Sequence, residues 1–310
     1  MSVKKISVVT PCYNEEGNVE ELCARVRAVM SGLAYEYEHI IIDNASADGT
    51  PGRLRALAAK DKRIKLIFNT RNFGHVRSPV HALFQASGDA VVAMASDLQD
   101  PPERIPEFVA KWEEGYPVVV GVKQKTRDLL VFHVLRTIYY RFLRSLSDVP
   151  LIENFTGFGL YDRKVIEVIR KIGDPYPYFR GLVADLGFDT ARILFVQQRR
   201  SRGISKNNFY TLYDLAMLGL TNYTKIPLRL AAMLGFFASI ISFLIGLVYL
   251  VYKLVFWYQF SLGSAPLVIG LFFLGSIQLF FLGIVGEYIG AIHTQIMDRP
   301  LVIEKERVNF

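Results

Sequence analysis

Two long apolar stretches near the end of this chain constrain its fold more than any other feature. Residues 230–252 contain no charged side chain, and residues 266–286 contain Gln278 as their only strongly polar one. As a helix, each stretch is long enough to cross roughly 30 Å of hydrocarbon. Two such runs joined by a short linker are improbable as buried core helices. We therefore expect two transmembrane helices within residues 225–292.

The cations around these stretches are distributed unevenly. The outer flanks carry Lys225, Arg229, Arg299, Lys305 and Arg307, whereas the loop between the stretches carries Lys253. Lys and Arg are enriched in the cytoplasmic flanks of membrane spans. We therefore expect a multi-pass protein of the inner (cytoplasmic) membrane, in which residues 1–224 and a tail of residues 293–310 both face the cytoplasm.

The composition agrees with a globular domain attached to a membrane. The mean hydropathy is +0.25 although 21% of the 310 residues are charged, so the apolar residues must be concentrated. Because the chain also contains apolar spans, its net charge of +7 indicates a membrane surface and phosphorylated ligands as binding partners rather than nucleic acid. Cys12 and Cys23 have no metal-like spacing, which is consistent with a reduced cytoplasmic location.

Four short β-rich runs alternate with helical patterns in the first hundred residues. The strands are expected at 6–10, 39–42, 64–68 and 90–95, and the helices at 18–30, 50–59 and 76–86. Asn18 is a candidate N-cap, and Pro51 is expected at the first helical position. This β-α-β-α order predicts an α/β fold with a doubly wound, mostly parallel sheet. Ligands of such sheets bind beyond the carboxyl ends of the strands.

The polar residues of most interest fall at these strand ends, in segments 11–15, 43–48 and 97–100. Asp97 and Asp100 offer the oxygen ligands that Mg²⁺ or Mn²⁺ prefers, and a metal there would neutralise a phosphate group. The alternative is that Asp100 is a helix N-cap, with Pro101 as the first helical residue. The Asp43 carboxylate could accept hydrogen bonds from a nucleobase or a ribose. For Ser46 and Asp48, capping of the next helix is the favoured interpretation.

Two basic segments have both a membrane interpretation and a structural one. Residues 129–146 lack acidic side chains and form a candidate interfacial helix (129–147), or equally a core helix with a solvated basic edge. The second segment precedes the first span and contains Arg199, Arg200, Arg202 and Lys206. A solvated basic face is the plain alternative there, but a nearby bilayer and anionic substrates favour phosphate binding.

Four motifs, in this order and spacing, resemble those of the family 2 inverting glycosyltransferases. They are Pro11-Cys-Tyr13-Asn14-Glu15-Glu16, Asp43…Ser46…Asp48-Gly-Thr50, Arg71-Asn-Phe-Gly74 and Asp97-Leu-Gln99-Asp-Pro-Pro-Glu103. More narrowly, the chain looks like the polyprenyl-phosphate glycosyltransferases, the group of dolichol-phosphate mannose synthases and bactoprenol glucosyltransferases. The resemblance continues through Arg202-Gly-Ile-Ser-Lys206, the two apolar stretches and Gly286-Glu287-Tyr288-Ile289-Gly290. It covers nearly the whole chain.

The resemblance implies a GT-A-like catalytic domain that moves one sugar from a nucleotide sugar, with a UDP-hexose favoured, to a polyprenyl-phosphate lipid. The product would serve cell-envelope glycan or glycoconjugate synthesis. The residues implied to bind the nucleotide sugar are Pro11, Tyr13, Glu15, Asp43, Ser46 and Asp97. Those implied in catalysis are Asp97, Gln99, Arg202 and Lys206, with Mg²⁺ or Mn²⁺ held at Asp97 and Gln99. The lipid phosphate would contact Arg199, Arg200, Arg202 and Lys206.

The chain departs from the family pattern at two positions. Ala95 stands where many relatives carry a further Asp, so metal ligation is expected to be leaner here. Gly157 stands where bactoprenol-type relatives carry an Asp that could act as a general base. A phosphate monoester has a second pKa near 6, so the acceptor is largely ionised at neutral pH and needs positioning more than deprotonation. Glu153, Asn154 and Asp162 are nearby candidates for substrate contacts, although Asp162 fits a helix start equally well.

Two other functions remain open from the sequence. A processive polysaccharide synthase is disfavoured by having only two spans and no Gln-x-x-Arg-Trp motif. A catalytically silent membrane scaffold is the other, since Ala95 and Gly157 both replace carboxylates. Glycines within the spans allow packing inside one chain or between chains, so a homo-oligomer also stays open.

Overall fold

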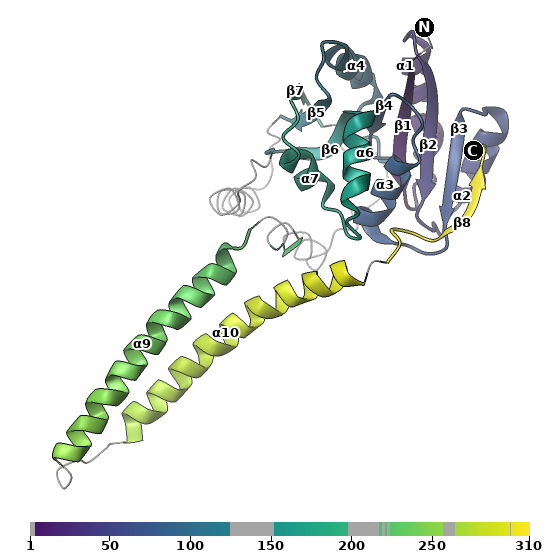
Figure 1. The fold of residues 1–310 in the computed structure, drawn as a ribbon. Helices are drawn as coiled ribbons and strands as arrows, with labels where there is room; N and C mark the ends of the chain where they lie inside the picture. The colour runs from purple at the N-terminus through teal and green to yellow at the C-terminus, as the bar shows by residue number, and fades with distance from the viewer. Residues whose placement is uncertain are drawn as a thin grey trace.

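The fold was analysed in a computed structural model that describes residues 4–124, 152–197, 217–218, 221, 224–256, 264–297 and 299–310. Among these residues, eight strands form one mixed sheet in the order β7-β5-β6-β4-β1-β2-β3-β8 (Figure 1). The strands are β1 (Lys5–Cys12), β2 (Glu36–Asp43), β3 (Ile64–Asn69), β4 (Ala90–Ala93), β5 (Val118–Lys123), β6 (Phe155–Asp162), β7 (Thr190–Phe195) and β8 (Glu304–Val308). The four central strands β4, β1, β2 and β3 are parallel, which confirms the predicted α/β sheet.

The antiparallel pairs lie on either side of this parallel centre. Strand β6 runs antiparallel to both β4 and β5, and β8 runs antiparallel to β3. The helices of the domain are α1 (Val19–Ser31), α2 (Thr50–Lys60), α3 (Gly74–Phe84), α4 (Ile105–Glu113), α6 (Arg163–Ile172) and α7 (Phe179–Asp185). Pro51 is the second helical residue of α2 rather than the first. Asn18 lies at the N-cap of α1 without a capping bond. Its Nδ2 donates to Glu15 Oε2 at 2.6 Å, and its buried Oδ1 has no hydrogen-bond partner among the described residues.

The central strands are almost wholly apolar because helices cover both faces of the sheet. On β1, Ile6 and Val8 belong to the hydrophobic cluster that contains residues of α1 and α4. Val9 points to the opposite face and joins the cluster that contains residues of α3 and α6. This two-sided burial leaves the ends of the strands as the part of the sheet that can meet a ligand.

A buried histidine in this core predicts a pH dependence of folding. His39 on β2 is 1% exposed and its Nε2 lies 3.0 Å from Thr10 Oγ1. Burial lowers the pKa of His39 to about 4. The folded state therefore binds fewer protons than the unfolded state between pH 4 and 6.5, so stability is complete above pH 6.5 and is lost as the pH falls.

We expect the free energy of unfolding in denaturant to be about 2 kcal/mol lower at pH 5 than at pH 7 because of His39. Tryptophan fluorescence of the detergent-solubilised chain would measure it. His39→Gln has no titrating ring and should show a smaller difference. An equal pH dependence in His39→Gln would contradict this origin.

Among the described residues, two helices are long and apolar enough to cross a membrane. They are α9 (Ile226–Val255) and α10 (Ser264–Ile296), with candidate spans Ile226–Val248 and Phe273–Ile296. Helix α10 thus continues ten residues past the predicted end at 286. Figure 1 shows the two helices side by side and extending away from the sheet domain. Most of their described apolar side chains are exposed, as expected for lipid-facing helices. Tyr288 is an exception, since it is buried and its hydroxyl donates to the Thr224 carbonyl at 2.7 Å.

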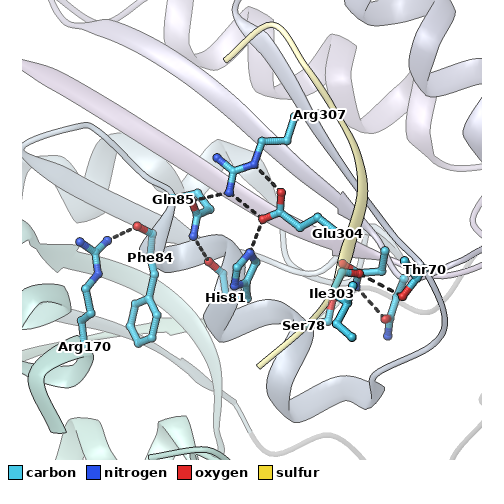
Figure 2. Close-up of polar contacts among 11 residues, drawn as sticks. Thr70, Ser78, His81, Phe84, Gln85, Arg170, Ile303, Glu304 and Arg307 are labelled. Atoms are coloured by element: carbon cyan, nitrogen blue, oxygen red, sulfur yellow. Dashed lines mark hydrogen bonds and ion pairs between the residues drawn. The ribbon is translucent and has the colours of Figure 1, made fainter. Parts of the chain in front are cut away.

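The chain returns from α10 to the edge of the sheet as β8, an element that the sequence analysis treated only as part of a tail. Glu304 lies 2.5 Å from His81 Nε2 and also accepts from Arg307, which reaches Gln85 at 2.8 Å. Figure 2 shows this network between β8 and α3. At the same edge, Thr70 N–H donates to the Ile303 carbonyl at 3.0 Å (Figure 2). The carboxyl end of β3 therefore lies beside the chain that leaves α10.

Candidate functional site

Three loops at the carboxyl ends of β1, β2 and β4 form the candidate site. Each loop contains a non-glycine residue in the left-handed region: Asn14 with φ 56°, Ala45 with φ 60° and Leu98 with φ 60°. This conformation is uncommon outside glycine and unfavourable for a bulky residue such as leucine. Strain of this kind concentrates at functional sites, where the surrounding structure holds it in place.

The first two loops are joined by hydrogen bonds around Ser46. Its hydroxyl accepts from Asn14 N–H at 2.8 Å and donates to Asp43 Oδ1 at 2.5 Å. Asn14 returns a contact by accepting from Ala47 N–H at 2.8 Å. Asp43 is 2% exposed, and burial raises its pKa against the hydrogen bonds from Ser46, which lower it. The structure therefore presents Asp43 as a fixed acceptor at the end of β2.

The two capping expectations in this loop have different outcomes. Asp48 Oδ1 accepts from Thr50 N–H at 3.0 Å at the start of α2, as predicted. Ser46 does not cap that helix but bridges Asp43 and Asn14. The capping interpretation of Ser46 is therefore wrong, because its hydroxyl bonds to Asp43 and to the N–H of Asn14 in the loop after β1.

The other nucleotide-site candidates lie around the end of β1. Pro11 pairs in register with Ile42, next to Asp43, and Tyr13 is half-buried two residues further on. Glu15 is 8% exposed; its N–H donates to Thr50 Oγ1 at 2.9 Å and its carboxylate accepts from Asn18. Buried Glu15 therefore fixes the loop after β1 through its bonds to Thr50 and Asn18.

The loop after β4 carries the candidate metal ligands. Gln99 N–H donates to Asp97 Oδ1 at 3.1 Å, across the left-handed turn at Leu98. Asp100 is 5% exposed and accepts from Ala95 N–H at 3.0 Å, and burial raises its pKa to about 6. Pro101 itself occupies the N-cap of the short 3₁₀ turn Pro102–Arg104. Asp100 thus braces the loop, and its predicted N-cap role is wrong.

The donor chemistry of this loop fits Mg²⁺ or Mn²⁺. The Asp97 carboxylate and the side-chain carbonyl of Gln99 offer oxygen ligands, which these hard cations prefer. Within the described residues, no group of three His, Cys, Asp or Glu side chains could hold a metal. A cation here would take most of its ligands from phosphate and water, as Mg²⁺ commonly does.

A set of asparagines behind the β2 loop was missed by the sequence analysis. Asn44 Oδ1 accepts from Phe73 N–H at 2.9 Å and from Asn69 Nδ2 at 3.0 Å, and Asn44 Nδ2 donates to Asn72 Oδ1 at 2.8 Å. These bonds attach the loop after β3 to the loop after β2. The Arg71-Asn-Phe-Gly74 motif marked this loop in the sequence, but nothing in the sequence predicted its hydrogen bonds to Asn44.

Gly157 and Asp162 lie at opposite ends of β6. Gly157 has φ +103°, a conformation that an aspartate adopts only with strain. Asp162 is the N-cap of α6 and accepts from Lys164 N–H and from Trp112 Nε1, so the helix-start interpretation is confirmed. The candidate lipid-phosphate residues Arg199, Arg200, Arg202 and Lys206, and the candidate interfacial helix 129–147, lie outside the described residues.

We expect Ser46→Ala to weaken binding of the nucleotide sugar by about tenfold, seen as a higher KM. The change removes the group that holds Asp43 and the β1 loop together. Asp48→Ala is the control, because it removes the bonds from Thr50 and Glu16 N–H but leaves the hydrogen bonds of Ser46 to Asp43 and Asn14 in place. It should lower stability while leaving the KM within about twofold. Equal KM values for both variants would contradict the role of Ser46.

Comparison with known proteins gives matches over both parts of the chain. Residues 7–170 match Glycosyl transferase family 2, and residues 226–292 match the GtrB C-terminal hairpin. The bactoprenol glucosyl transferase of Shigella phage SfII is 34% identical over 303 residues, covering 97% of this chain and 98% of that protein. The uncharacterized glycosyltransferase YkcC of Bacillus subtilis is 36% identical over 298 residues, covering 96% of this chain and 92% of that protein.

A solved structure with a similar fold is the mannosyltransferase PcManGT from Pyrobaculum calidifontis in complex with GDP-Man and Mn²⁺. It shares 21% identity with a TM-score of 0.47, and the match covers 71% of this chain and 63% of that one. The family assignment rests on the sequence matches, which span more than half of the chain. The chain belongs to glycosyl transferase family 2, and its residues 226–292 match the GtrB C-terminal hairpin.

Proposed function

We propose that this enzyme transfers a single sugar from a nucleotide sugar, with a UDP-hexose as the favoured donor, to polyprenyl phosphate at the cytoplasmic face of the membrane. The observation that carries the proposal is the bond from Thr70 N–H to the Ile303 carbonyl at 3.0 Å. It joins the chain that leaves α10 to the end of β3, whose loop is hydrogen-bonded through Asn44 to the loop that carries Asp43. A lipid-borne acceptor at the membrane surface could therefore reach this end of the sheet.

The relatives support the same acceptor. The phage SfII and SfV proteins named bactoprenol glucosyl transferase match nearly the full length of this chain at 34% identity. Their similarity includes the C-terminal hairpin, which a transferase acting on a soluble acceptor would not need. We assign the two candidate spans to a multi-pass anchor that leaves residues 1–224 in the cytoplasm, as the flanking cations favour.

The proposed reaction is a single displacement with inversion. An oxygen of the acceptor phosphate attacks the anomeric carbon as the bond from that carbon to the nucleoside diphosphate breaks. The acceptor needs no general base, because its second pKa lies near 6. Asp43 would hold the base or ribose, and Asp97 with Gln99 would hold Mg²⁺ or Mn²⁺. That cation would supply charge neutralisation for the leaving diphosphate.

The acceptor phosphate requires cations of its own for positioning. We assign this role to Arg202 and Lys206, with Arg199 and Arg200 beside them, because they precede the first span in sequence. Charge-assisted bonds from guanidinium groups to phosphate are among the strongest that side chains make.

Membranes containing the protein would test the proposal when incubated with polyprenyl phosphate and each of several radiolabelled nucleotide sugars. We expect one donor, a UDP-hexose, to give a labelled product that extracts into organic solvent and releases a single sugar on mild acid treatment. Label found only in a water-soluble polymer, or only as free sugar, would overturn the proposal.

A further inference from the structure

Three arginines gather where the chain leaving α10 meets the catalytic domain. Arg71 follows β3, Arg77 lies on α3 and Arg299 follows α10. The guanidinium carbons of Arg71 and Arg77 lie 4.1 Å and 5.4 Å from the centroid of the same ring, that of Phe73. Arg77 also donates through Nη2 to the carbonyl of Pro300, the neighbour of Arg299. Segments from opposite ends of the chain thus build one arginine cluster (Arg71, Arg77 and Arg299).

The positive charge of the arginine cluster is not compensated within the described residues. Arg25, Arg53 and Arg55 on the same domain each pair with a glutamate. Within the described ranges, by contrast, no ion pair involves Arg71, Arg77 or Arg299. The buried Nε atom of Arg77 has no hydrogen-bond partner there either. Burial and the charges of Arg71 and Arg299 lower the pKa of Arg77. An anion at this cluster would relieve that repulsion.

The arginine cluster also follows the second candidate span closely in sequence. Arg299 comes three residues after Ile296, the last residue of the second candidate span. Arg71 and Arg299 are exposed, so a ligand can approach them. Guanidinium groups bind phosphate oxygens through two parallel hydrogen bonds, and cations next to a span are attracted to anionic lipids.

The arginine cluster is too far from Asp97 to serve the acceptor phosphate. Arg71 follows β3 and Asp97 follows β4, and these strands are three positions apart in the sheet. At a strand spacing of about 4.8 Å, the two strand ends are separated by roughly 14 Å. The attacking phosphate must lie beside the diphosphate of the donor, so a phosphate bound at the cluster would belong to another molecule.

We propose that the arginine cluster binds the phosphate of an anionic membrane phospholipid, at a site separate from that of the acceptor. The bound headgroup would hold the carboxyl edge of the sheet against the membrane surface at the point where α10 enters it. The inference does not depend on which sugar or which acceptor the enzyme uses.

Native mass spectrometry of the full-length protein in detergent would test this site, with phosphatidylglycerol or phosphatidylcholine added in equal amounts. We expect the protein to retain phosphatidylglycerol and not phosphatidylcholine. The variant Arg71→Gln/Arg77→Gln/Arg299→Gln should retain at least roughly tenfold less phosphatidylglycerol. The control Lys4→Gln/Lys60→Gln/Lys164→Gln removes as many charges from exposed positions elsewhere, and should retain as much as the wild type.

Two further measurements separate the lipid from other sources of phosphate. Inorganic phosphate at millimolar concentration should not displace the phosphatidylglycerol. The UDP affinity of Arg77→Gln/Arg299→Gln, which leaves the motif of residues 71–74 intact, should equal that of the wild type. The proposal is overturned if the triple arginine variant and the lysine control lose the lipid equally, or if neither does. Displacement by inorganic phosphate would overturn it in favour of a free-anion site, and a large loss of UDP affinity in favour of the donor pocket.

Discussion

Asp97→Ala is expected to abolish sugar transfer, with a loss of at least about a thousandfold in kcat, while the domain stays folded. Asp97 would hold the cation that neutralises the leaving diphosphate, and losing that neutralisation costs roughly 4 kcal/mol in the transition state. Asp97 is the carboxylate that the loop after β4 places at the carboxyl edge of the sheet, beside Gln99. Radiolabel transfer to polyprenyl phosphate with saturating Mg²⁺ or Mn²⁺ would measure the loss.

The isosteric variant Asp97→Asn separates charge from shape. It keeps an acceptor for Gln99 N–H but provides no negative charge, so it should be nearly as inactive as Asp97→Ala. Unfolding in denaturant should change by less than about 1 kcal/mol in both variants, since Asp97 is only partly buried. Transfer at the wild-type rate in either variant would show that the metal and diphosphate lie elsewhere.

A chain that stops after Met297 is expected to lose about 4 kcal/mol of domain stability, because β8 is then absent. The removed segment contributes the ladder of β8 with β3 and the packing of Val302, which precedes the strand and is 6% exposed. Asn309 adds two bonds, to the carbonyls of Ala58 at 2.9 Å and Ile64 at 2.8 Å. Loss of buried apolar contacts together with hydrogen bonds of this kind gives that magnitude. Denaturant unfolding, followed by fluorescence, would measure it.

The variant Glu304→Gln/Arg307→Gln keeps the backbone of β8 but weakens its ionic contacts with α3. Arginine–glutamate pairs that are partly exposed contribute little, so this variant should lose only about 1 kcal/mol. Arg307 and Glu304 are 40% and 19% exposed in their side chains. If the truncated chain were as stable as this variant, the backbone pairing of β8 would not be the source of the effect.

The sequence was sufficient for the parallel centre of the fold. The runs 6–10, 39–42 and 64–68 lie inside β1, β2 and β3, because strands covered on both faces are continuously apolar and easily recognised. The alternating strand β8, with its sequence Glu-Lys-Glu-Arg-Val, has no such run. It is held by its partner β3 and by contacts with α3, which are distant in sequence.

The candidate site was predictable in its composition but not in its internal contacts. The strand-end position of Asp43 and Asp97 follows from the order of strands, whereas the bond from Ser46 to Asn14 depends on how two loops meet. The left-handed conformations of Ala45 and Leu98 carry no sequence signal, since neither residue favours them. They are imposed by the packing around each loop.

The return of the chain from α10 to β8 also sets an order of events during synthesis. The ribosome makes β3 more than 230 residues before β8, and both candidate spans are translated between them. Until then the β3 edge is unpaired, the state in which a strand recruits other chains. The sheet is therefore completed only after both apolar helices have been translated, so the last step of catalytic-domain folding follows the synthesis of the hairpin.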